Sequence, residues 1–509
     1  MTESFSTRLN DAMALRELKQ IDFVHAAEKF NIKLGKSHMS QYVSGKTVPR
    51  ADIAHFLAAY LRVNEDWLMG KDVPMEEHAA ILPDFAGEQP DHVDDASEQS
   101  TEGRTMRTFT KSHKLDNVLY DVRGPVADEA VRMEAAGTHI LKLNIGNPAP
   151  FGFRTPDEVS TTCRSSCPTR KLFAVEGPVL RAQSHHAVCA AEEHPNVSID
   201  DIYTGNGVSE LINLSLSALL DNGDEVLVPS PDYPLWTACV NLAGGTAVHY
   251  VCDEDSEWYP DIDDMRSKIT DKTKAIVIIN PNNPTGALYP KEVLQQIVDL
   301  AREHQLMIFS DEIYDRLVMD GLEHISIASL APDLFCVTFS GLSKSHMIAG
   351  WRVGWMVLSG NKRLAKDYIE GLNMLANMRM CSNVPAQSVV QTALGGHQSV
   401  KDYLVPGGRI YDQRELVYNM LNDIPGITAV KPKAAFYIFP KIDVKKFNIH
   451  SDEQFALDLL HDKHILISHG GAFNWQEPDH FRVVYLPRIS MLKETIGEIG
   501  DFFSTYWQA

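Results

Sequence analysis

The sequence lacks any apolar run of membrane-spanning length, and its first residues lack the basic-then-apolar pattern of a signal peptide. Basic residues are also few, because 47 Lys and Arg face 68 Asp and Glu and leave a net charge of −21. This balance argues against broad electrostatic binding to nucleic acid or to an anionic membrane, although a local basic surface remains compatible with it. We therefore expect a cytoplasmic protein that does not bind membranes.

Cysteine is sparse, and its spacing does not fit a zinc site. The chain has 7 Cys among 509 residues, and Cys163 and Cys167 have no nearby His/Cys pair to complete a ligand set. We therefore expect reduced thiols and no bound metal. No low-complexity sequence dominates the chain, and 44% of its residues are hydrophobic. This composition and length are typical of a globular protein with two or three domains.

Residues 1–72 are predicted to form a small all-α domain. Apolar residues recur there at helical spacing, as in Leu9, Ala12 and Met13. This stretch resembles a helix-turn-helix domain of the phage-repressor (Cro/C1, Xre-like) type, whose second helix would begin near residue 36. That resemblance implies DNA binding in the major groove, with base or phosphate contacts expected from Lys36, Ser37, Ser40, Gln41 and Lys46. The alternative is a plain helical bundle used for dimerisation.

Residues 73–106 are predicted to be an acidic flexible linker. Between residues 73 and 103 the chain has nine Asp or Glu and no Lys or Arg, and Pro, Ser, Gly and Gln fill much of the rest. Such a segment buries too little apolar surface to fold alone, so we expect it to be extended.

From about residue 107 onward, helical segments alternate with short, continuous apolar runs. Examples of these runs are residues 225–229, 275–280 and 306–311. The alternation predicts an α/β domain over residues 107–509, with a largely parallel sheet that helices cover on both faces. Ligands of such folds bind beyond the carboxyl ends of the strands, so we expect the functional residues there.

Lys344 lies in a turn of small and hydroxylated residues, and Arg352 follows between two glycines. A lysine that forms a Schiff base needs this setting, because nearby hydroxyls and a guanidinium hold the anionic group of a cofactor. Gly207, Val208 and Ser209 precede a helical run, where backbone N–H groups and the helix dipole favour a phosphate. The alternatives are a surface lysine in a flexible loop and a glycine turn that only caps a helix.

Further polar and aromatic residues follow the predicted strands. Tyr233 could stack on a flat ring, although core packing would also explain it, and Asn283 lies in a rigid turn rich in amides. Asp311 ends an apolar run, where a buried carboxylate can pair with a protonated pyridine nitrogen, and Tyr314 follows it. Arg482 can bind a substrate carboxylate through two parallel hydrogen bonds.

Together these motifs resemble the fold-type I pyridoxal-phosphate aminotransferases, and most closely the bacterial glutamate–pyruvate (alanine) aminotransferases. The resemblance covers roughly residues 107–509. It implies an α/β PLP-transferase fold of type I, with a mostly parallel, seven-stranded-type sheet in a large domain at about 150–395. It also implies a homodimer and a small α+β domain formed by the N-terminal arm and residues of about 396–509.

The family pattern implies a role for each motif residue of this sequence. Lys344 would form the internal aldimine with pyridoxal 5'-phosphate and later shuttle the proton, and Asp311 would bind the pyridine nitrogen. Asn283 and Tyr314 would bind the ring oxygen, while Tyr233 would stack on the ring. The residues expected around the phosphate are Gly207, Val208, Ser209, Ser340, Ser343 and Arg352. Those expected to contact the amino-acid substrate are Gly146, Asn283 and Arg482.

The activity implied by the resemblance is transamination, in which L-alanine and 2-oxoglutarate give pyruvate and L-glutamate. Lys344, Asp311, Arg352 and Arg482 are all present. Their presence favours an enzyme, because a sensor need not keep both a proton carrier and a substrate arginine. The alternative is a helix-turn-helix transcription regulator whose aminotransferase-like domain senses pyridoxal phosphate or an amino acid. A catalytically dead fusion is a third interpretation.

The resemblance fails between about residues 159 and 194. The family has a Gly-Tyr-Ser-x-Ser-x-Gly stretch there, whose tyrosine reaches the cofactor phosphate of the neighbouring subunit. Back-translated with chosen synonymous codons and read one base later, residues 172–186 give Tyr-Ser-Gln-Ser-Lys-Gly-Leu-Phe-Ser-Ala-Arg-Lys-Ala-Ile. The hypothesis is a frameshifted segment that impairs activity, and resequencing of the gene tests it. The alternative is a segment that has genuinely diverged.

Overall fold

The structure is a computed structural model that describes residues 5–16, 18–29, 34–61, 63, 65–70, 114, 124–166 and 194–509. The chain divides into two compact units, Met1–Arg107 and Thr108–Ala509. The predicted linker at 73–106, and residues 167–193 of the segment at 159–194, lie outside the described residues. Within the described part of the chain, no helix is both long and apolar enough to cross a membrane.

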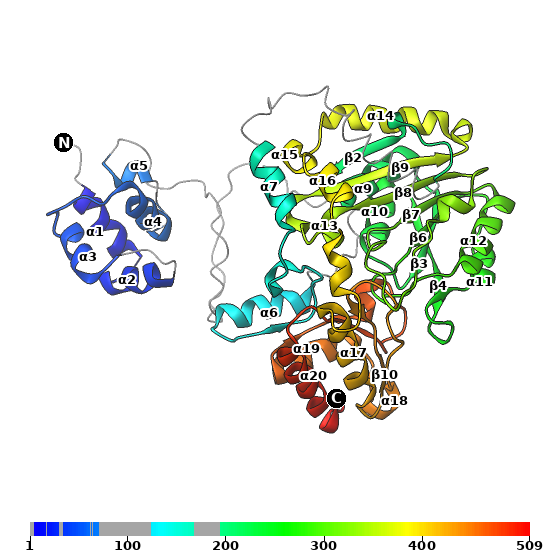
Figure 1. The fold of residues 1–509 in the computed structure, drawn as a ribbon. Coiled ribbons are helices and arrows are strands. Elements are labelled where there is room, and N and C mark those ends of the chain that lie inside the picture. The colour runs from blue at the N-terminus through cyan, green and yellow to red at the C-terminus, as the bar shows by residue number, and fades with distance from the viewer. Residues whose placement is uncertain are drawn as a thin grey trace, which may run out of the picture. The chain divides into compact units, whose positions relative to one another are not determined.

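The described elements of the first unit are all helices. They are α1 (Phe5–Leu15), α2 (Gln20–Lys29), α3 (Lys36–Val43), α4 (Ala51–Leu61) and α5 (Glu65–Leu68) (Figure 1). One core joins them, because Leu9 of α1, Phe23 of α2, Met39 of α3 and Leu57 of α4 are fully buried. The helix-turn-helix assignment of this unit stays a prediction.

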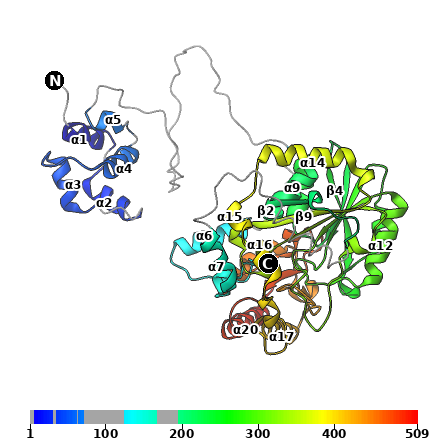
Figure 2. The same cartoon turned by 45° about the horizontal axis from the view of Figure 1, so that its top comes forward.

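The second unit is built around one sheet, which appears from two directions in Figure 1 and Figure 2. Its described strands run in the order β2-β9-β8-β7-β6-β3-β4-β5. Their bounds are β2 (Ile202–Asn206), β3 (Glu225–Ser230), β4 (Thr246–Asp253), β5 (Tyr259–Pro260), β6 (Thr273–Ile279), β7 (Met307–Asp311), β8 (Phe335–Gly341) and β9 (Val353–Gly360). The apolar runs predicted at 225–229, 275–280 and 306–311 correspond to β3, β6 and β7.

This sheet corrects the predicted seven-stranded, mostly parallel sheet to an eight-stranded mixed one among the described residues. β3–β4, β3–β6, β6–β7 and β7–β8 pair in parallel, whereas β2–β9, β8–β9 and β4–β5 pair antiparallel. β9 returns antiparallel to β8 because only a short segment, which carries Lys344, joins them, and a parallel crossover needs a dozen or more residues. The two-residue β5 adds the extra strand at the edge beside β4.

Helices cover both faces of the sheet. On one face lie α9 (Val208–Leu219), α10 (Leu235–Ala243) and α14 (Lys366–Arg379), and on the other lie α11 (Ile262–Ser267) and α12 (Lys291–His304). Successive side chains of a strand point to opposite faces, so Val226 and Val228 of β3 pack in one core and Leu227 in the other. Each buried side chain of this size contributes about 1.5–3 kcal/mol. Burial on both sides explains why β3 is apolar throughout.

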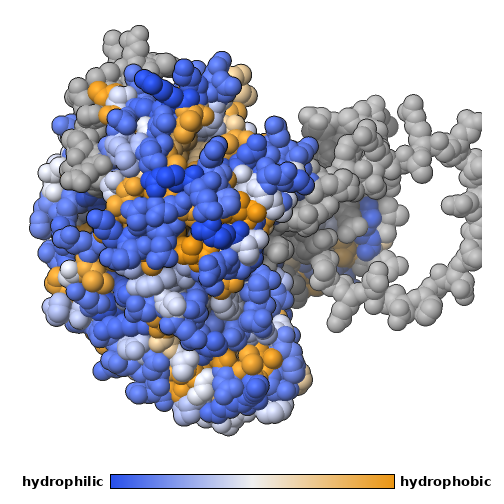
Figure 3. All heavy atoms as spheres, turned by 90° about the vertical axis from the view of Figure 1, so that its right-hand side faces the viewer, coloured by the Kyte–Doolittle hydropathy of each residue, from blue (hydrophilic) through white to orange (hydrophobic). Residues whose placement is uncertain are grey.

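The outer surface over α11 and α12 is largely hydrophilic, with small hydrophobic patches between the polar residues (Figure 3). The apolar residues of α12 point inward, since Leu294, Ile297 and Val298 are fully buried. Their spacing of three and four residues places them on one face of the helix.

The C-terminal part of the second unit packs around a separate core. Its strands are β10 (Ile427–Thr428), β11 (Tyr437–Ile438), β12 (Lys441–Ile442), β13 (Ile465–Leu466), β14 (Ser468–His469) and β15 (Phe481–Val484). Its helices are α17 (Arg409–Asn422), α18 (Val444–Phe447), α19 (Asp452–Lys463) and α20 (Ile489–Thr505). From the N-terminal side, α6 (Pro125–Ala135) joins this core, and β1 (Leu141–Lys142) pairs in parallel with β13.

A further core lies beside β9. It joins the helices α7 (Asp157–Ser166), α13 (Leu342–Ser345), α15 (Val384–Gln387) and α16 (Val390–Gly395) to that strand. α13 is the short helix that carries Lys344. Its Leu342 is fully buried in this core, which fixes the position of the lysine backbone.

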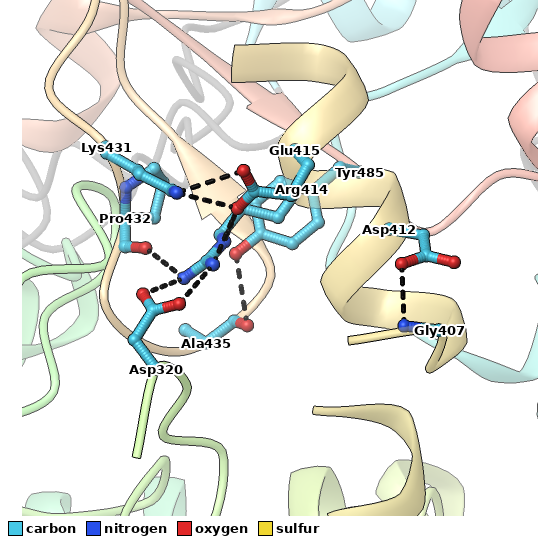
Figure 4. A network of polar contacts seen from close by, with 9 residues as sticks. All are labelled: Asp320, Gly407, Asp412, Arg414, Glu415, Lys431, Pro432, Ala435 and Tyr485. Carbon is cyan, nitrogen blue, oxygen red and sulfur yellow. Dashed lines mark hydrogen bonds and ion pairs between the residues drawn. The ribbon is translucent and has the colours of Figure 1, made fainter. Parts of the chain in front are cut away.

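A buried arginine ties the C-terminal core to the segment after β7. The side chain of Arg414 on α17 is fully buried, and its Nη1 and Nη2 donate to the two carboxylate oxygens of Asp320 at 2.6 and 2.7 Å (Figure 4). Arg414 also donates to the Pro432 carbonyl at 3.0 Å and to Glu415 at 2.7 Å. It therefore holds α17, the segment after β7 and the segment before β11 in one arrangement.

Candidate active site

A cavity of about 240 Å³ opens at the carboxyl ends of β7 and β8, beside the start of α9. The predicted site residues that line this pocket are Gly146, Val208, Ser209, Tyr233, Asn283, Asp311, Tyr314, Ser343, Lys344, Arg352 and Arg482. Gly207 and Ser340, also predicted, lie just outside the lining. Gly207 immediately precedes α9, and Ser340 is buried in β8.

The amine of Lys344 is held at the centre of this pocket. Its Nζ donates to the Gly146 carbonyl oxygen at 2.8 Å and lies 5.7 Å from the centroid of the Tyr314 ring. Only glycine fits at position 146, because an added Cβ would lie 1.9 Å from the hydroxyl oxygen of Tyr437. The absence of a side chain thus lets the backbone carbonyl of Gly146 reach the lysine. A positioned amine with one hydrogen bond can act as a nucleophile and as a proton carrier.

Asp311 places a buried carboxylate in the wall of the pocket. The residue is 3% exposed; its Oδ2 accepts a hydrogen bond from Trp236 Nε1 at 3.1 Å, and its Oδ1 accepts one from the Ile313 amide at 3.3 Å. Burial raises the pKa of Asp311 to about 6, although these two donors and the charge of Lys344 lower it. A cationic N–H group against this carboxylate would favour the ionised form, because opposite charges attract strongly in a buried site.

The start of α9 and Arg352 form an anion-binding cradle. Arg352 has a left-handed backbone (φ 58), and its Nη1 and Nη2 donate to the carbonyls of Ala349 and Asn206 at 3.0 and 3.3 Å. The guanidinium lies so close to Gly207 that an added Cβ there would be 2.3 Å from Nη2. Backbone N–H groups at a helix start and an arginine are the partners that a phosphate prefers.

Arg482 enters the pocket from β15. It is 4% exposed, and its Nη1 donates to the side-chain oxygen of Asn283 at 2.9 Å while its Nη2 donates to the Asn144 carbonyl. Its guanidinium carbon lies 4.5 Å from the ring centroids of both Tyr437 and Phe473. The aromatic rings fix the plane of the guanidinium, which suits bidentate binding of a carboxylate.

Two tyrosine hydroxyls meet beside Lys344. The hydroxyl oxygens of Tyr314 and Tyr437 lie 2.8 Å apart, and both residues are almost completely buried. Burial, with a smaller contribution from Tyr437, raises the pKa of Tyr314 well above its ordinary value. Tyr314 is therefore a neutral phenol that can donate its single O–H at physiological pH.

Sequence reasoning missed several residues of this site. Those that line the pocket are Asn144, Ile145, Ile212, Ile313, Ala349 and Tyr437. Trp236 is also missing from the predicted set, although its N–H holds Asp311. A tryptophan three residues after Tyr233 was a usable signal, because a buried indole N–H needs an acceptor. The position of Tyr437, by contrast, depends on the packing of β11 and has no local signal.

Comparison with known proteins places this geometry in a family. The model of the family "Aminotransferase class I and II" matches residues 139–498. The glutamate-pyruvate aminotransferase AlaA of Haemophilus influenzae is 55% identical over 410 residues, which are 79% of this chain and 100% of the relative. An alanine aminotransferase of Mycobacterium tuberculosis is 53% identical over 407 residues, which are 79% of this chain and 94% of the relative.

Solved structures agree with these sequence matches. An aminotransferase from Escherichia coli has a TM-score of 0.78 at 54% identity and covers 79% of this chain and 100% of its own. Alanine aminotransferase from Pyrococcus furiosus has a TM-score of 0.74 at 38% identity, with coverage of 78% and 100%. The predicted aminotransferase fold of type I is thus confirmed for the second unit. The chain belongs to the class I and II aminotransferases, which use pyridoxal phosphate.

Proposed function

We propose that this chain catalyses transamination between L-alanine and 2-oxoglutarate, with pyruvate and L-glutamate as products. The observation that carries the proposal is the convergence of the Lys344 amine, the Asp311 carboxylate and the Arg482 guanidinium on one pocket. The choice of substrates is supported by the names of the relatives, which include glutamate-pyruvate aminotransferase and alanine aminotransferase.

The residues of the pocket fit pyridoxal phosphate on two observations. The space between Gly207 and Arg352 is one that an added Cβ would fill, and it lies at the start of a helix, where a phosphate is favoured. Asp311 is buried, and its oxygens accept hydrogen bonds from two neutral donors, the Trp236 indole and the Ile313 amide, so it suits a protonated ring nitrogen. Tyr314 can donate to the ring oxygen, and Tyr233 lines the pocket where a ring would stack.

The bound cofactor supplies a carbonyl that captures the amino group of the substrate and a ring that delocalises the electron pair of the broken Cα–H bond. Arg482 binds the substrate carboxylate, and Asn283 keeps the arginine in place. Lys344 would take the proton from the substrate Cα and deliver it to C4′ of the cofactor, and its contact with the Gly146 carbonyl holds the amine where it acts. Asp311 stays ionised beside the ring nitrogen and so stabilises a proton there.

A single-turnover assay tests this proposal. Purified protein loaded with pyridoxal phosphate is mixed with L-alanine, while cofactor absorbance and released pyruvate are followed. We expect loss of the cofactor's visible band and release of pyruvate in equal amount. A Lys344→Ala variant loses both signals. Binding of L-alanine without pyruvate release would refute the enzyme and favour the amino-acid sensor.

The segment at 159–194 is tested in the same assay. A variant in which this segment carries the restored reading frame is compared with the chain as written. If the frameshift hypothesis is correct, the restored variant turns over L-alanine faster. Equal rates would show that the segment is a divergent but functional one.

We also propose that residues 1–72 bind DNA through α3. Lys36 and Ser40 are exposed, Gln41 is half-exposed, and Lys46 is exposed beyond the end of the helix, while Met39 between them packs into the core. One polar face of α3 is therefore accessible within the described unit. Ser37 is the remaining predicted contact, and its side chain lies outside the described part of the structure.

Fluorescence anisotropy with random and selected DNA duplexes tests this second proposal. The logarithm of the binding constant should fall linearly with the logarithm of the salt concentration. Loss of Lys46 should make the slope of that line shallower by about one. A chain that binds no duplex at low salt would favour the plain helical bundle.

We propose a homodimer for the second unit. Met374, Met378 and Met380 at the end of α14 are 62%, 79% and 77% exposed, which is unusual for large apolar side chains. Arg379 among them binds Glu210 of α9, so this apolar segment lies next to the anion-binding cradle. A second copy of the chain would cover it, as the family resemblance implies. Light scattering of wild type and a Met378→Glu variant measures this association.

The predicted cytoplasmic location stays a prediction.

A further inference from the structure

Tyr437 connects the two parts of the second unit that meet at the pocket. It lies on β11, which pairs with β15, the strand that carries Arg482. Its hydroxyl reaches Tyr314, which follows β7 and Asp311, at an oxygen–oxygen distance of 2.8 Å. Gly146 leaves room for this hydroxyl, since an added Cβ would occupy the same space.

The ring of Tyr437 also lies under a positive charge. The guanidinium carbon of Arg482 is 4.5 Å from the centroid of the ring, and both side chains are almost completely buried. A cation over an aromatic face withdraws electron density from it. The O–H of a phenol in this position becomes a stronger hydrogen-bond donor.

The direction of the hydrogen bond between the two hydroxyls follows from the number of protons. Each phenol has one O–H to donate. This step rests on the proposed function, in which Tyr314 donates its proton to the ring oxygen of the cofactor. Tyr314 then has only its oxygen to offer to Tyr437, so Tyr437 is the donor of the 2.8 Å bond. Hydrogen bonds in such a chain strengthen one another.

We propose that Tyr437 is a positioning residue that couples the substrate arginine to the cofactor through Tyr314. With the carboxylate site empty, the charge of Arg482 strengthens the Tyr437–Tyr314 chain and stabilises negative charge on the ring oxygen of the cofactor. When a substrate carboxylate neutralises Arg482, the chain weakens. The proton affinity of the Schiff-base nitrogen formed with Lys344 then rises at the moment of substrate binding.

The pH midpoint of the cofactor's absorbance change, with Lys344 attached, measures this coupling. We expect Tyr437→Phe to raise that midpoint by about 0.5 pH unit, the effect of losing one neutral buried hydrogen bond. In the wild type, propionate, which carries the carboxylate and methyl group of alanine but no amino group, should raise the midpoint. In Tyr437→Phe the same ligand should raise it by clearly less.

Matched variants separate this role from a structural one. Tyr485→Phe removes a buried hydroxyl from the residue that directly follows β15, where it donates to the Ala435 carbonyl at 3.2 Å, and should leave the midpoint unchanged. In a Tyr314→Phe background, Tyr437→Phe should cause no further shift. Incorporation of 3-fluorotyrosine at position 437 keeps the hydroxyl, makes it a stronger donor and should lower the midpoint.

The outcomes distinguish this inference from the proposed function. A midpoint in Tyr437→Phe equal to that of the wild type, or a full propionate shift in that variant, would overturn the coupling while the aminotransferase stands. A rise with 3-fluorotyrosine would also overturn it. If the wild-type chain formed no Schiff-base absorbance band, the proposed aminotransferase function would be refuted, and the proposed coupling would be refuted with it.

Discussion

Replacing Trp236 by Phe removes one hydrogen-bond donor from Asp311 and leaves an aromatic ring in the same core. Trp236 is fully buried, and its Nε1 lies 3.1 Å from Asp311 Oδ2. A hydrogen bond to an ionised group contributes about 1.5–3 kcal/mol. Its loss corresponds to a further rise of about 1–2 units in the pKa of Asp311, which burial already raises to about 6.

The sign of the pH effect follows from linkage. The pKa of Asp311 is higher in the folded chain than its ordinary value of 3.8, so the folded state binds this proton more tightly than the unfolded state. The favourable contribution of Asp311 to the free energy of unfolding is therefore present at low pH and is lost as pH rises through about 6. In Trp236→Phe the lost donor matters only where Asp311 is ionised. The additional destabilisation should be small at pH 5 and approach about 1.5–3 kcal/mol at pH 8.

Thermal unfolding of the cofactor-free chain at pH 5 and pH 8 measures this difference. Trp258→Phe is the matched control, because Trp258 is 1% exposed and packs against Phe439 and Trp475 in the other core. It loses the same ring atoms away from Asp311, so its cavity penalty should not follow the titration of that carboxylate. If the penalty of Trp236→Phe were equal at the two pH values, the Trp236–Asp311 hydrogen bond would not tune this carboxylate.

Three further substitutions follow from the same contacts. Gly146→Ala should lower kcat/KM for L-alanine by about 100-fold, because the new Cβ would lie 1.9 Å from the Tyr437 hydroxyl and displace the carbonyl that holds the lysine. Asp320→Ala should destabilise the chain by about 1.5–3 kcal/mol, because the fully buried guanidinium of Arg414 loses its bidentate partner and keeps only Glu415 and the Pro432 carbonyl. Arg482→Lys should raise KM for L-alanine more than it lowers kcat, because lysine keeps the charge and loses the two-pronged geometry.

Two of these predictions, those for Asp320 and Gly146, have a direct control. Asp412→Ala on α17 removes a carboxylate whose one hydrogen bond within the described part of the chain comes from the exposed Gly407 amide at 3.0 Å, and its effect on the melting temperature should be small (Figure 4). A loss below about 1 kcal/mol in Asp320→Ala would contradict the role of the buried pair. Gly497→Ala on α20 is a control for position 146, because an added Cβ there meets nothing within 4 Å and the backbone has no positive φ. Unchanged KM in Arg482→Lys would show that the arginine does not bind the carboxylate.

Much of the site was predictable because its residues belong to short motifs at strand ends. Asp311 ends β7, and Lys344 and Arg352 lie between β8 and β9, so the local sequence places them where ligands of α/β folds bind. The apolar runs of β3, β6 and β7 were readable for a related reason. Both faces of these strands are covered, and a strand buried on both faces must be apolar at every position.

The sheet order and the sheet's mixed character were not predictable in this way. β9 lies between β2 and β8, and its antiparallel direction follows from the short segment that precedes it. A continuous apolar run fits a parallel or an antiparallel neighbour equally well, because both bury the same side chains. The order of strands therefore depends on how helices and connections pack.

Local sequence determined which chemical groups this chain offers: an amine at Lys344, a carboxylate at Asp311 and a guanidinium at Arg482, each in a recognisable motif. Tertiary structure alone decided what these groups touch. Tyr437 meets Tyr314 across 123 residues of chain, and Trp236 meets Asp311 across 75. No periodicity or motif encodes such a contact, because the geometry of a hydrogen bond depends on the positions of two separate segments. Those positions are set by the cores beneath them.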